Sequence, residues 1–293
     1  MRYRIRHVTE YSYPETVSLC HNEARLNPRS TTRQRCVQAS VSCEPGAAYR
    51  SEREDFFGNR VSFLTIEQPH ILLRVVAESL VEVLPEIGQL DLGRDTPWDE
   101  ARQRLDTELS EAMLEARPYR LESPRIPTLE DLADYARPSF GPGRPLGEAV
   151  ADLMARIHGD FEYDPGFTTV STPLETVLEH RKGVCQDFAH LAIGCLRAMG
   201  LAARYVSGYL ETRPPPGQEK LQGADASHAW FSVFDPERGW LDFDPTNNLV
   251  PMDRHITLAW GRDYTDVAPL KGVLFGGGES HGLSVAVDVT AES

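Results

Sequence analysis

The sequence predicts an α+β protein with an antiparallel β domain at its N-terminus, and three observations carry this prediction. Apolar and polar residues alternate through much of residues 1–84, and a period of two is typical of β-strands. Helical periodicity follows and is clearest in residues 147–161 and 183–200. Two alternating runs joined by a short Pro/Gly turn then predict a β-hairpin over residues 228–248.

Composition and charge limit the function classes. The chain has 293 residues, which corresponds to two domains at roughly 150 residues each. Apolar residues make up 41% and charged residues 25%, as in ordinary globular proteins. The net charge of −14 argues against a nucleic-acid partner. The first 50 residues are instead basic, with eight arginines and four glutamates, and we interpret them as a solvated sheet surface rather than a docking face.

The sequence shows no targeting or cofactor signal. No apolar run approaches the roughly 18 residues that a membrane helix needs, and the first residues lack an apolar signal segment. We therefore expect a cytoplasmic protein with no membrane partner. The five cysteines form no CxxC pair and show no zinc-like spacing with histidine, so we expect free thiols. No DxDxDG calcium loop is present, and we expect no metal or other cofactor.

The N-terminal region is expected to contain several strands. The opening MRYRIRHVTEYSY alternates, and CVQASVSCEP and VSFLTIEQP show the same pattern. The turn-rich DFFGNR lies between the last two. Residues 71–85 fit either a strand or a helix, and their Val and Leu content together with the stop at Pro85 favours a strand.

The next segment has a different character. A helix is predicted over residues 97–116, with Thr96 before it and Pro97 at its first position, and several prolines follow. A short helix is predicted over residues 173–183, with Thr172 as its N-cap. We divide the chain into an N-terminal β domain, a helical and Pro-rich connector and a core domain: residues 1–84, 85–146 and 147–293.

The helix predicted over residues 183–200 carries a cysteine in its first turn. Its apolar residues fall on one stripe, and Gly200 ends it at the usual C-cap position. Unpaired backbone N–H groups and the helix dipole stabilise a thiolate at Cys185, and the same N–H groups are placed to hold an oxyanion. The alternative is that Cys185 is a small buried hydrophobe. The remaining cysteines are expected to be structural: Cys20, Cys36, Cys43 and Cys195.

The predicted hairpin brings a histidine and an aspartate together. His228 begins its first strand and Asp244 ends the second, so the two lie side by side in an antiparallel pair. With Cys185 they have the residue types and order of a nucleophile, a base and an orienting carboxylate. Asp242 shares a face with Asp244, but Pro245 holds Asp244 extended and nearer to His228. Taken alone, His228 could equally be a hydrogen-bonded sheet histidine.

Several motifs together resemble a known family. The order GVCQDFAH, LRAMGLAARYVSGYL, DASHAWFSVF and GWLDFDPTNN resembles the transglutaminase-like superfamily. The whole chain is most similar to bacterial transglutaminase-like cysteine peptidases. The segments YRIRHVTEYSYPE, LNPR and DFFGNR resemble the N-terminal domain of these peptidases, and GRDYTDVAPLKGV resembles their C-terminal tail.

The resemblance implies a papain-like core, in which the helix that bears the cysteine packs on an antiparallel sheet. It also implies a catalytic triad of Cys185, His228 and Asp244. The side chain that donates to the oxyanion is not assigned, and Tyr163 and Gln186 are the candidates. Residues 261–264 either line the cleft or form a turn with Arg–Asp pairing.

The triad predicts attack of a thiolate on an amide and a thioester intermediate. With water as acceptor, the protein is a cysteine peptidase or amidase, which we favour. With an amine as acceptor, it is a protein-glutamine transglutaminase. A third alternative is a catalytically silent scaffold whose N-terminal domain binds a protein partner. The acidic chain favours a basic or neutral peptide or amide as substrate.

Overall fold

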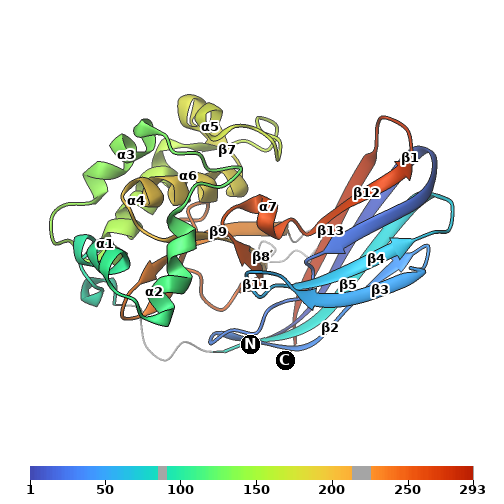
Figure 1. The fold of residues 1–293 in the computed structure, drawn as a ribbon, viewed down its shortest axis with the longest axis horizontal. Helices are drawn as coiled ribbons and strands as arrows, with labels where there is room; N and C mark the ends of the chain where they lie inside the picture. The colour runs from blue at the N-terminus through green and yellow to red at the C-terminus, as the bar shows by residue number, and fades with distance from the viewer. Residues whose placement is uncertain (85–90, 213–225, 293) are drawn as a thin grey trace, which may run out of the picture.

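The computed structural model describes residues 1–84, 91–212 and 226–292. The fold is α+β, as the sequence predicts. Figure 1 shows helices gathered at one end of the molecule, a long β-sheet at the other end, and a smaller sheet between them. The two chain ends lie close together at the lower edge of the long sheet in this view.

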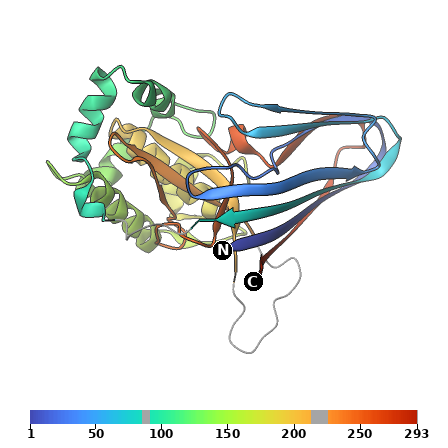
Figure 2. The same ribbon diagram turned by 90° about the horizontal axis from the view of Figure 1, so that it is seen from below.

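The long sheet is organised by one strand, β1 (Arg2–Ala24). Its first half pairs with β5 and β13, and its second half pairs with β4 and β12. Seen from below, the strands therefore form two layers that share β1 (Figure 2). The other strands of this antiparallel sheet are β2 (Gln34–Glu44), β3 (Tyr49–Glu54), β4 (Arg60–Ile66), β5 (His70–Val83), β12 (Leu270–Gly276) and β13 (Gly282–Glu292). The strand favoured for residues 71–85 is confirmed by β5.

The C-terminal strands return to the beginning of the chain. β13 pairs with β1 from Arg2↔Glu292 to Ser12↔Gly282, and β12 pairs with the second half of β1. The side chains of Val287 and Val289 are buried in the main hydrophobic core. The range predicted for the core domain, residues 147–293, therefore includes two strands that belong to the N-terminal sheet. Their partner β1 lies more than 240 residues away in the sequence, and strand periodicity alone does not identify a partner.

The smaller sheet is antiparallel, with the order β10–β9–β8–β11. Its strands are β8 (Ala203–Leu210), β9 (Ala226–Asp235), β10 (Gly239–Phe243) and β11 (His255–Gly261). At Gly208 a side chain would collide with the Ile256 carbonyl and the Trp230 ring, so glycine allows this close packing. The predicted hairpin is confirmed by β9 and β10, but its second strand ends at Phe243 rather than continuing to residue 248, and Asp244 follows outside the ladder.

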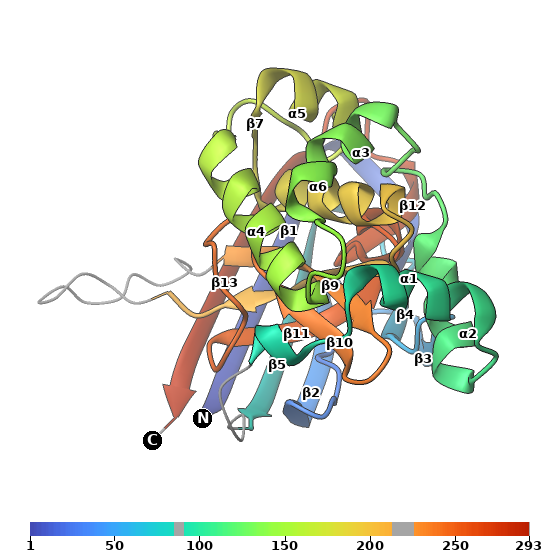
Figure 3. The same cartoon turned by 90° about the vertical axis from the view of Figure 1, so that its left-hand side faces the viewer.

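The helices gather around one end of the smaller sheet, toward the viewer in Figure 3, and the helix that bears Cys185 packs on one of its faces. They are α1 (Trp98–Thr107), α2 (Glu111–Ala116), α3 (Glu130–Ala136), α4 (Leu146–Asp160), α5 (Leu174–His180), α6 (Cys185–Ala198) and α7 (Tyr264–Val267). Short elements complete the fold: η1 (Leu92–Arg94), η2 (Arg117–Arg120), η3 (Arg137–Ser139), β6 (Glu162–Tyr163) and β7 (Lys182–Gly183). Phe188 and Leu191 of α6 share the buried core with Phe231 and Val233 of β9.

The single helix predicted over residues 97–116 is in fact two. α1 ends at Thr107, because the Arg117 guanidinium donates hydrogen bonds to the carbonyls of Leu105, Asp106 and Glu108 in place of further helix turns. The chain then turns, and Met113 of α2 packs in the same cluster as Leu105. Side-chain periodicity continued across this break, so the sequence pattern did not reveal it.

Two predicted helix starts are also corrected. The N-cap of α5 is Pro173, and the Thr172 hydroxyl instead accepts a hydrogen bond from the Thr169 backbone N–H. Pro97 is the N-cap of α1 rather than its first residue. Thr96 is held outside the helix, because its N–H and hydroxyl both donate to the buried Asp235 carboxylate.

We predict that Ile5→Ala destabilises the protein strongly. Ile5 of β1 is 1% exposed and belongs to the core that joins both sheets, so its truncation costs about 2–5 kcal/mol of unfolding free energy. The matched control is Ile71→Ala on β5, where the side chain is 61% exposed and the cost is at most about 1 kcal/mol. Urea unfolding of both variants measures the difference, and equal losses would contradict the buried role of β1.

Candidate active site

Cys185 is the first residue of α6, and the preceding turn fixes its position. The Asp187 carboxylate accepts hydrogen bonds from the Val184 backbone N–H at 2.8 Å and from the Thr168 hydroxyl at 2.6 Å. A side chain at Gly183 would collide with Asp187, so glycine is required for this approach. The arrangement leaves Cys185 partly exposed, at the end of the helix that favours negative charge.

His228 and Asp244 lie together at the open end of the hairpin. The ladder between β9 and β10 ends at Phe231↔Phe243, and Asp244 follows in a turn. His228 Nε2 is 2.7 Å from Asp244 Oδ2. Because a carboxylate only accepts, the Nε2–H of His228 donates to Asp244, and Cys185 also interacts electrostatically with the ring.

The electrostatics of this pair favour an ion pair. Burial alone would lower the pKa of His228, but the hydrogen bonds and charges of Asp244 and Cys185 outweigh burial and raise the pKa to about 10. Burial likewise opposes ionisation of Asp244, and the hydrogen bonds from His228 and His255 hold its pKa well below the ordinary range. At neutral pH the site therefore contains an imidazolium beside a carboxylate.

Two residues that sequence reasoning missed also bind this carboxylate. His255 Nε2 is 3.0 Å from Asp244 Oδ2, and Asn247 Nδ2 donates to the same oxygen at 2.8 Å. The Thr246 and Asn247 backbone N–H groups donate to Oδ1. Asn247 lies three residues after Asp244 in the motif DPTNN, where turn-forming Asn was a usable signal. His255 begins a different strand, and no local pattern connects it to the site.

Among the residues that the structure describes, His228, Asp244 and His255 form a cluster with the spacing of metal ligands. Ligand atoms of His228, Asp244 and His255 lie within 4.8 Å of one another. However, the Asn247 amide N–H, which cannot ligate a cation, also donates to Asp244 Oδ2. With three N–H donors directed at one oxygen, the geometry fits a hydrogen-bonded carboxylate better than a metal centre.

Cys185 and His228 open into a pocket of about 470 Å³ between the core and the N-terminal sheet. The core contributes Gln186, Tyr205 and Ser207. The opposite wall comes from alternate residues of β1 and β13: His7, Thr9, Tyr11, Leu283, Val285 and Val287. The site is thus walled by both ends of the chain. The alternation of the opening segment predicts a strand but does not show what its faces contact.

A buried contact joins this wall to the core. His7 Nδ1 is 2.9 Å from the Tyr209 hydroxyl, and His7 Nε2 is 3.0 Å from the Thr9 hydroxyl. Burial lowers the pKa of His7 to about 4, so the ring is neutral and serves as both donor and acceptor. The contact fixes the N-terminal sheet against β8.

The remaining candidates separate into two groups. Gln186 lines the pocket, whereas Tyr163 is 53% exposed and lies outside its lining. Asp242 accepts a hydrogen bond from the Ser232 hydroxyl and lines a different cavity. The structure thus places Asp244, and not Asp242, against His228.

The motif over residues 261–264 serves both predicted purposes. Tyr264 lines the pocket. Arg262 does pair with an aspartate, but its partner is Asp266, at 3.0 Å, while Asp263 caps α7 by accepting from the Thr265 N–H at 2.8 Å.

Comparison with known proteins shows the family. Residues 3–82 match the bacterial transglutaminase-like N-terminal region, and residues 133–245 match the transglutaminase-like superfamily. An uncharacterized protein of Mycobacterium tuberculosis is 43% identical over 98% of this chain and 92% of its own. The chain belongs to the bacterial transglutaminase-like branch of the transglutaminase-like superfamily.

Two further relatives are informative. A protein-glutamine gamma-glutamyltransferase of Pseudomonas aeruginosa is 28% identical over 46% of this chain and 24% of its own length. The crystal structure of a "putative cysteine protease" from Cytophaga hutchinsonii is similar over 100% of this chain and 92% of that one, with a TM-score of 0.72 and 22% identity. The second likeness shows the papain-like fold. Within the described residues, no helix has the length and apolar content to cross a membrane.

We predict that His228 loses its ring proton only near pH 10. Its pKa is raised above the ordinary 6.5, so the stabilisation that its charge provides is complete below about pH 6.5 and is lost as the pH rises through 10. Asp244→Asn removes the charge and the hydrogen bond of the carboxylate that oppose burial, so it lowers the pKa of His228. NMR titration of the ring measures both values.

Asp242→Asn is the control for this titration, because Asp242 makes no hydrogen bond to His228 among the described residues and its loss leaves the titration unchanged. A wild-type pKa near 6.5 would contradict the ion pair.

Proposed function

We propose that the protein is a thiol-dependent amide hydrolase, a cysteine peptidase or amidase, with Cys185 as nucleophile. The observation that supports this most is the joining of three features in one pocket. These are a cysteine at a helix N-terminus, a histidine that pairs with it and a buried carboxylate behind the histidine. The proposed substrate is a peptide or another amide.

In the first half-reaction, the Cys185 Sγ thiolate attacks the amide carbonyl carbon and forms a C–S bond. The backbone N–H groups of the first turn of α6 are placed to donate to the resulting oxyanion. The C–N bond then breaks, and His228 Nδ1 gives its proton to the leaving amine. Asp244 holds the ring through Nε2 during this transfer. The product is a thioester on Cys185.

In the second half-reaction, neutral His228 takes a proton from water through Nδ1. The hydroxide oxygen attacks the thioester carbon, the C–S bond breaks, and a carboxylic acid leaves. The thiolate and the imidazolium are restored. If a primary amine replaces water, the same steps form a new amide.

Transamidation is the second candidate, and one observation favours it. The Pseudomonas aeruginosa relative over the core carries the name of a protein-glutamine gamma-glutamyltransferase. Mass spectrometry of a diverse peptide mixture, with and without a primary amine, distinguishes the two reactions. Backbone cleavage or loss of ammonia supports the hydrolase, and a mass gain equal to the amine, with loss of ammonia, supports the transferase. Neither change occurs with Cys185→Ala.

A silent scaffold is the third candidate, and thiol reactivity tests it. At pH 7, iodoacetamide is expected to label Cys185 about tenfold faster or more than any of the other four cysteines, because Cys185 combines partial exposure, a helix N-terminus and a histidine, whereas Cys20, which contacts His70, is buried on a strand. His228→Ala removes this advantage. Labelling is followed by peptide mass spectrometry, and equal rates at all five thiols would favour the scaffold.

The choice of aspartate makes a further prediction. Asp244→Asn is expected to lower kcat by about 10²–10⁴-fold, because the side chain that orients His228 loses its charge. Asp242→Asn is the matched control and changes kcat only slightly, since Asp242 binds Ser232 and faces another cavity. Steady-state kinetics on the substrate found above decides, and the reverse order would contradict this assignment.

A further inference from the structure

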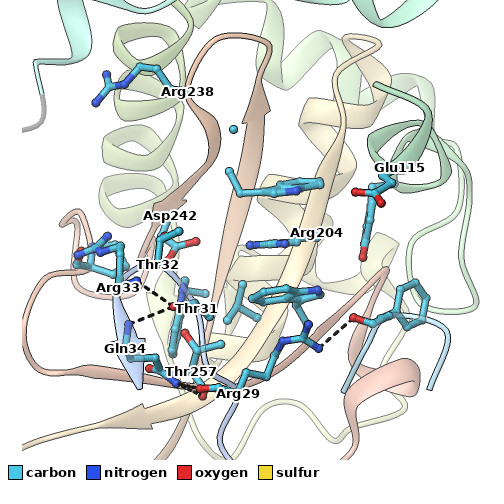
Figure 4. A pocket seen from close by; sticks show the side chains of 18 of the residues that line it. Arg29, Thr31, Thr32, Arg33, Gln34, Glu115, Arg204, Arg238, Asp242 and Thr257 are labelled. Atoms are coloured by element: carbon cyan, nitrogen blue, oxygen red, sulfur yellow. Dashed lines mark hydrogen bonds between the residues drawn. The ribbon is translucent and has the colours of Figure 1, made fainter. Parts of the chain in front are cut away.

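A second and larger cavity lies on the opposite face of the smaller sheet from α6. Its volume is about 1170 Å³, which is the size of a pocket for an organic ligand rather than for a single ion. Strands β8 and β10, helix α2 and the segment of residues 29–34 all contribute to its lining. Figure 4 shows arginine side chains from these different elements around it.

The unusual feature of this cavity is Arg204. Its guanidinium carbon lies 3.8 Å from the ring centre of Trp260 and 4.3 Å from that of Trp240. Arg29 covers Trp260 as well, at 3.7 Å, and Figure 4 shows the guanidinium groups of Arg29 and Arg204 at separate levels with a ring between them. Two indole rings thus hold the Arg204 fork in one orientation.

Arg204 is buried without a counter-ion. Its side chain lies in a residue only 7% exposed, and in the described ranges no carboxylate is within ion-pairing distance of it. Its one hydrogen bond to a described residue runs from Nε to the Ser232 hydroxyl at 3.3 Å. The negative charge of Asp242 acts on Arg204, but the Asp242 carboxylate itself accepts a hydrogen bond from the Ser232 hydroxyl. Because the indoles cover the faces of the fork, its terminal N–H groups are left to bond at the edge.

Other donors of the same cavity also lack acceptors. Trp230 lines the cavity and is fully buried. Its Nε1–H has no hydrogen-bond partner among the described residues. Arg29 Nε is in the same condition. Leaving a buried donor without a partner is unfavourable, and an acceptor group next to these donors would satisfy them.

The neighbouring arginines show that Arg204 differs. Arg238 lines the same cavity but is paired with the Asp95 carboxylate. Arg33 donates to the Pro251 carbonyl at 2.7 Å. Three acidic residues also line the cavity: Asp242, which accepts from Ser232, and Glu111 and Glu115 of α2, which form no ion pair with Arg204 within the described chain.

We propose that this cavity binds an organic anion, whose carboxylate or phosphate group is held by the edge of the Arg204 guanidinium. A planar fork fixed between aromatic faces is well suited to bidentate recognition of such groups. The apolar body of the ligand lies against the aromatic wall that Phe57, Trp240 and Trp260 form. The cavity also contains His255, which contacts Asp244, so the occupant lies one residue away from the carboxylate of the candidate active site.

Intrinsic fluorescence tests this proposal, because three of the four tryptophans line the cavity. The wild-type protein is titrated with phenyl phosphate, phenylacetate and inorganic phosphate. We expect a saturable change with at least one of the two organic anions and weaker binding of inorganic phosphate. The two organic probes distinguish a phosphate from a carboxylate ligand. No saturable change with either one overturns the proposal.

Variants locate the binding group. Arg204→Gln is expected to weaken binding by about tenfold or more, because a charged hydrogen bond is lost. Arg238→Gln, which alters an arginine already paired with Asp95, retains wild-type affinity. Unchanged affinity in the Arg204 variant overturns the proposal.

Arg204 is buried, so folding is checked by circular dichroism and thermal unfolding. If Arg204→Gln does not fold, Arg204→Lys replaces it, which keeps the charge and loses the fork. The same weakening is then expected, and wild-type affinity overturns the proposal. A rise in the Tm of the wild-type protein with the bound probe gives an independent readout.

Discussion

The carboxylate of Asp244 is the charge around which the candidate site is built. It is fully buried, and an isolated carboxylate in such a place would be protonated or would destabilise the fold. Donors from a turn and from two strands compensate for the lost water: side chains of His228, Asn247 and His255 at one oxygen, and backbone N–H groups at the other. Because Asp244 stays ionised, it holds the His228 ring through Nε2 and stabilises the imidazolium.

Local chemistry explains how much of this site could be predicted from the sequence. Cys185 was recognisable because the helix signal around it is strong, and the hairpin signal brought Asp244 close to His228. The sequence does not show where the strand pairing ends. In the structure the pairing ends at Phe243, so Asp244 lies in the turn that follows and contacts His228 from outside the ladder. Asp244 was separated from Asp242 by the extended conformation that Pro245 imposes, and the hydrogen bond to His228 agrees with that choice.

The parts that could not be predicted depend on contacts between distant segments. His255 lies on β11 and reaches Asp244 only through the pairing of β11 with β8. The break between α1 and α2 depends on hydrogen bonds from Arg117, which no periodicity reports. The pairing of β13 with β1 joins the two ends of the chain, and many partners would satisfy the same alternating pattern.

The wall of the pocket bears on which acceptor attacks the thioester. The part that matches the transglutaminase-like superfamily, residues 133–245, contains Cys185, His228 and Asp244, but no residue of β1 or β13. In the mechanism that we propose, the core therefore carries the step that is common to hydrolases and transferases. Access of water or an amine to the thioester carbon is governed in addition by the opposite wall, where Leu283 and Val285 present apolar surface. Membership of the superfamily thus predicts the attack of the thiolate, whereas the acceptor depends on how the N-terminal sheet closes over Cys185.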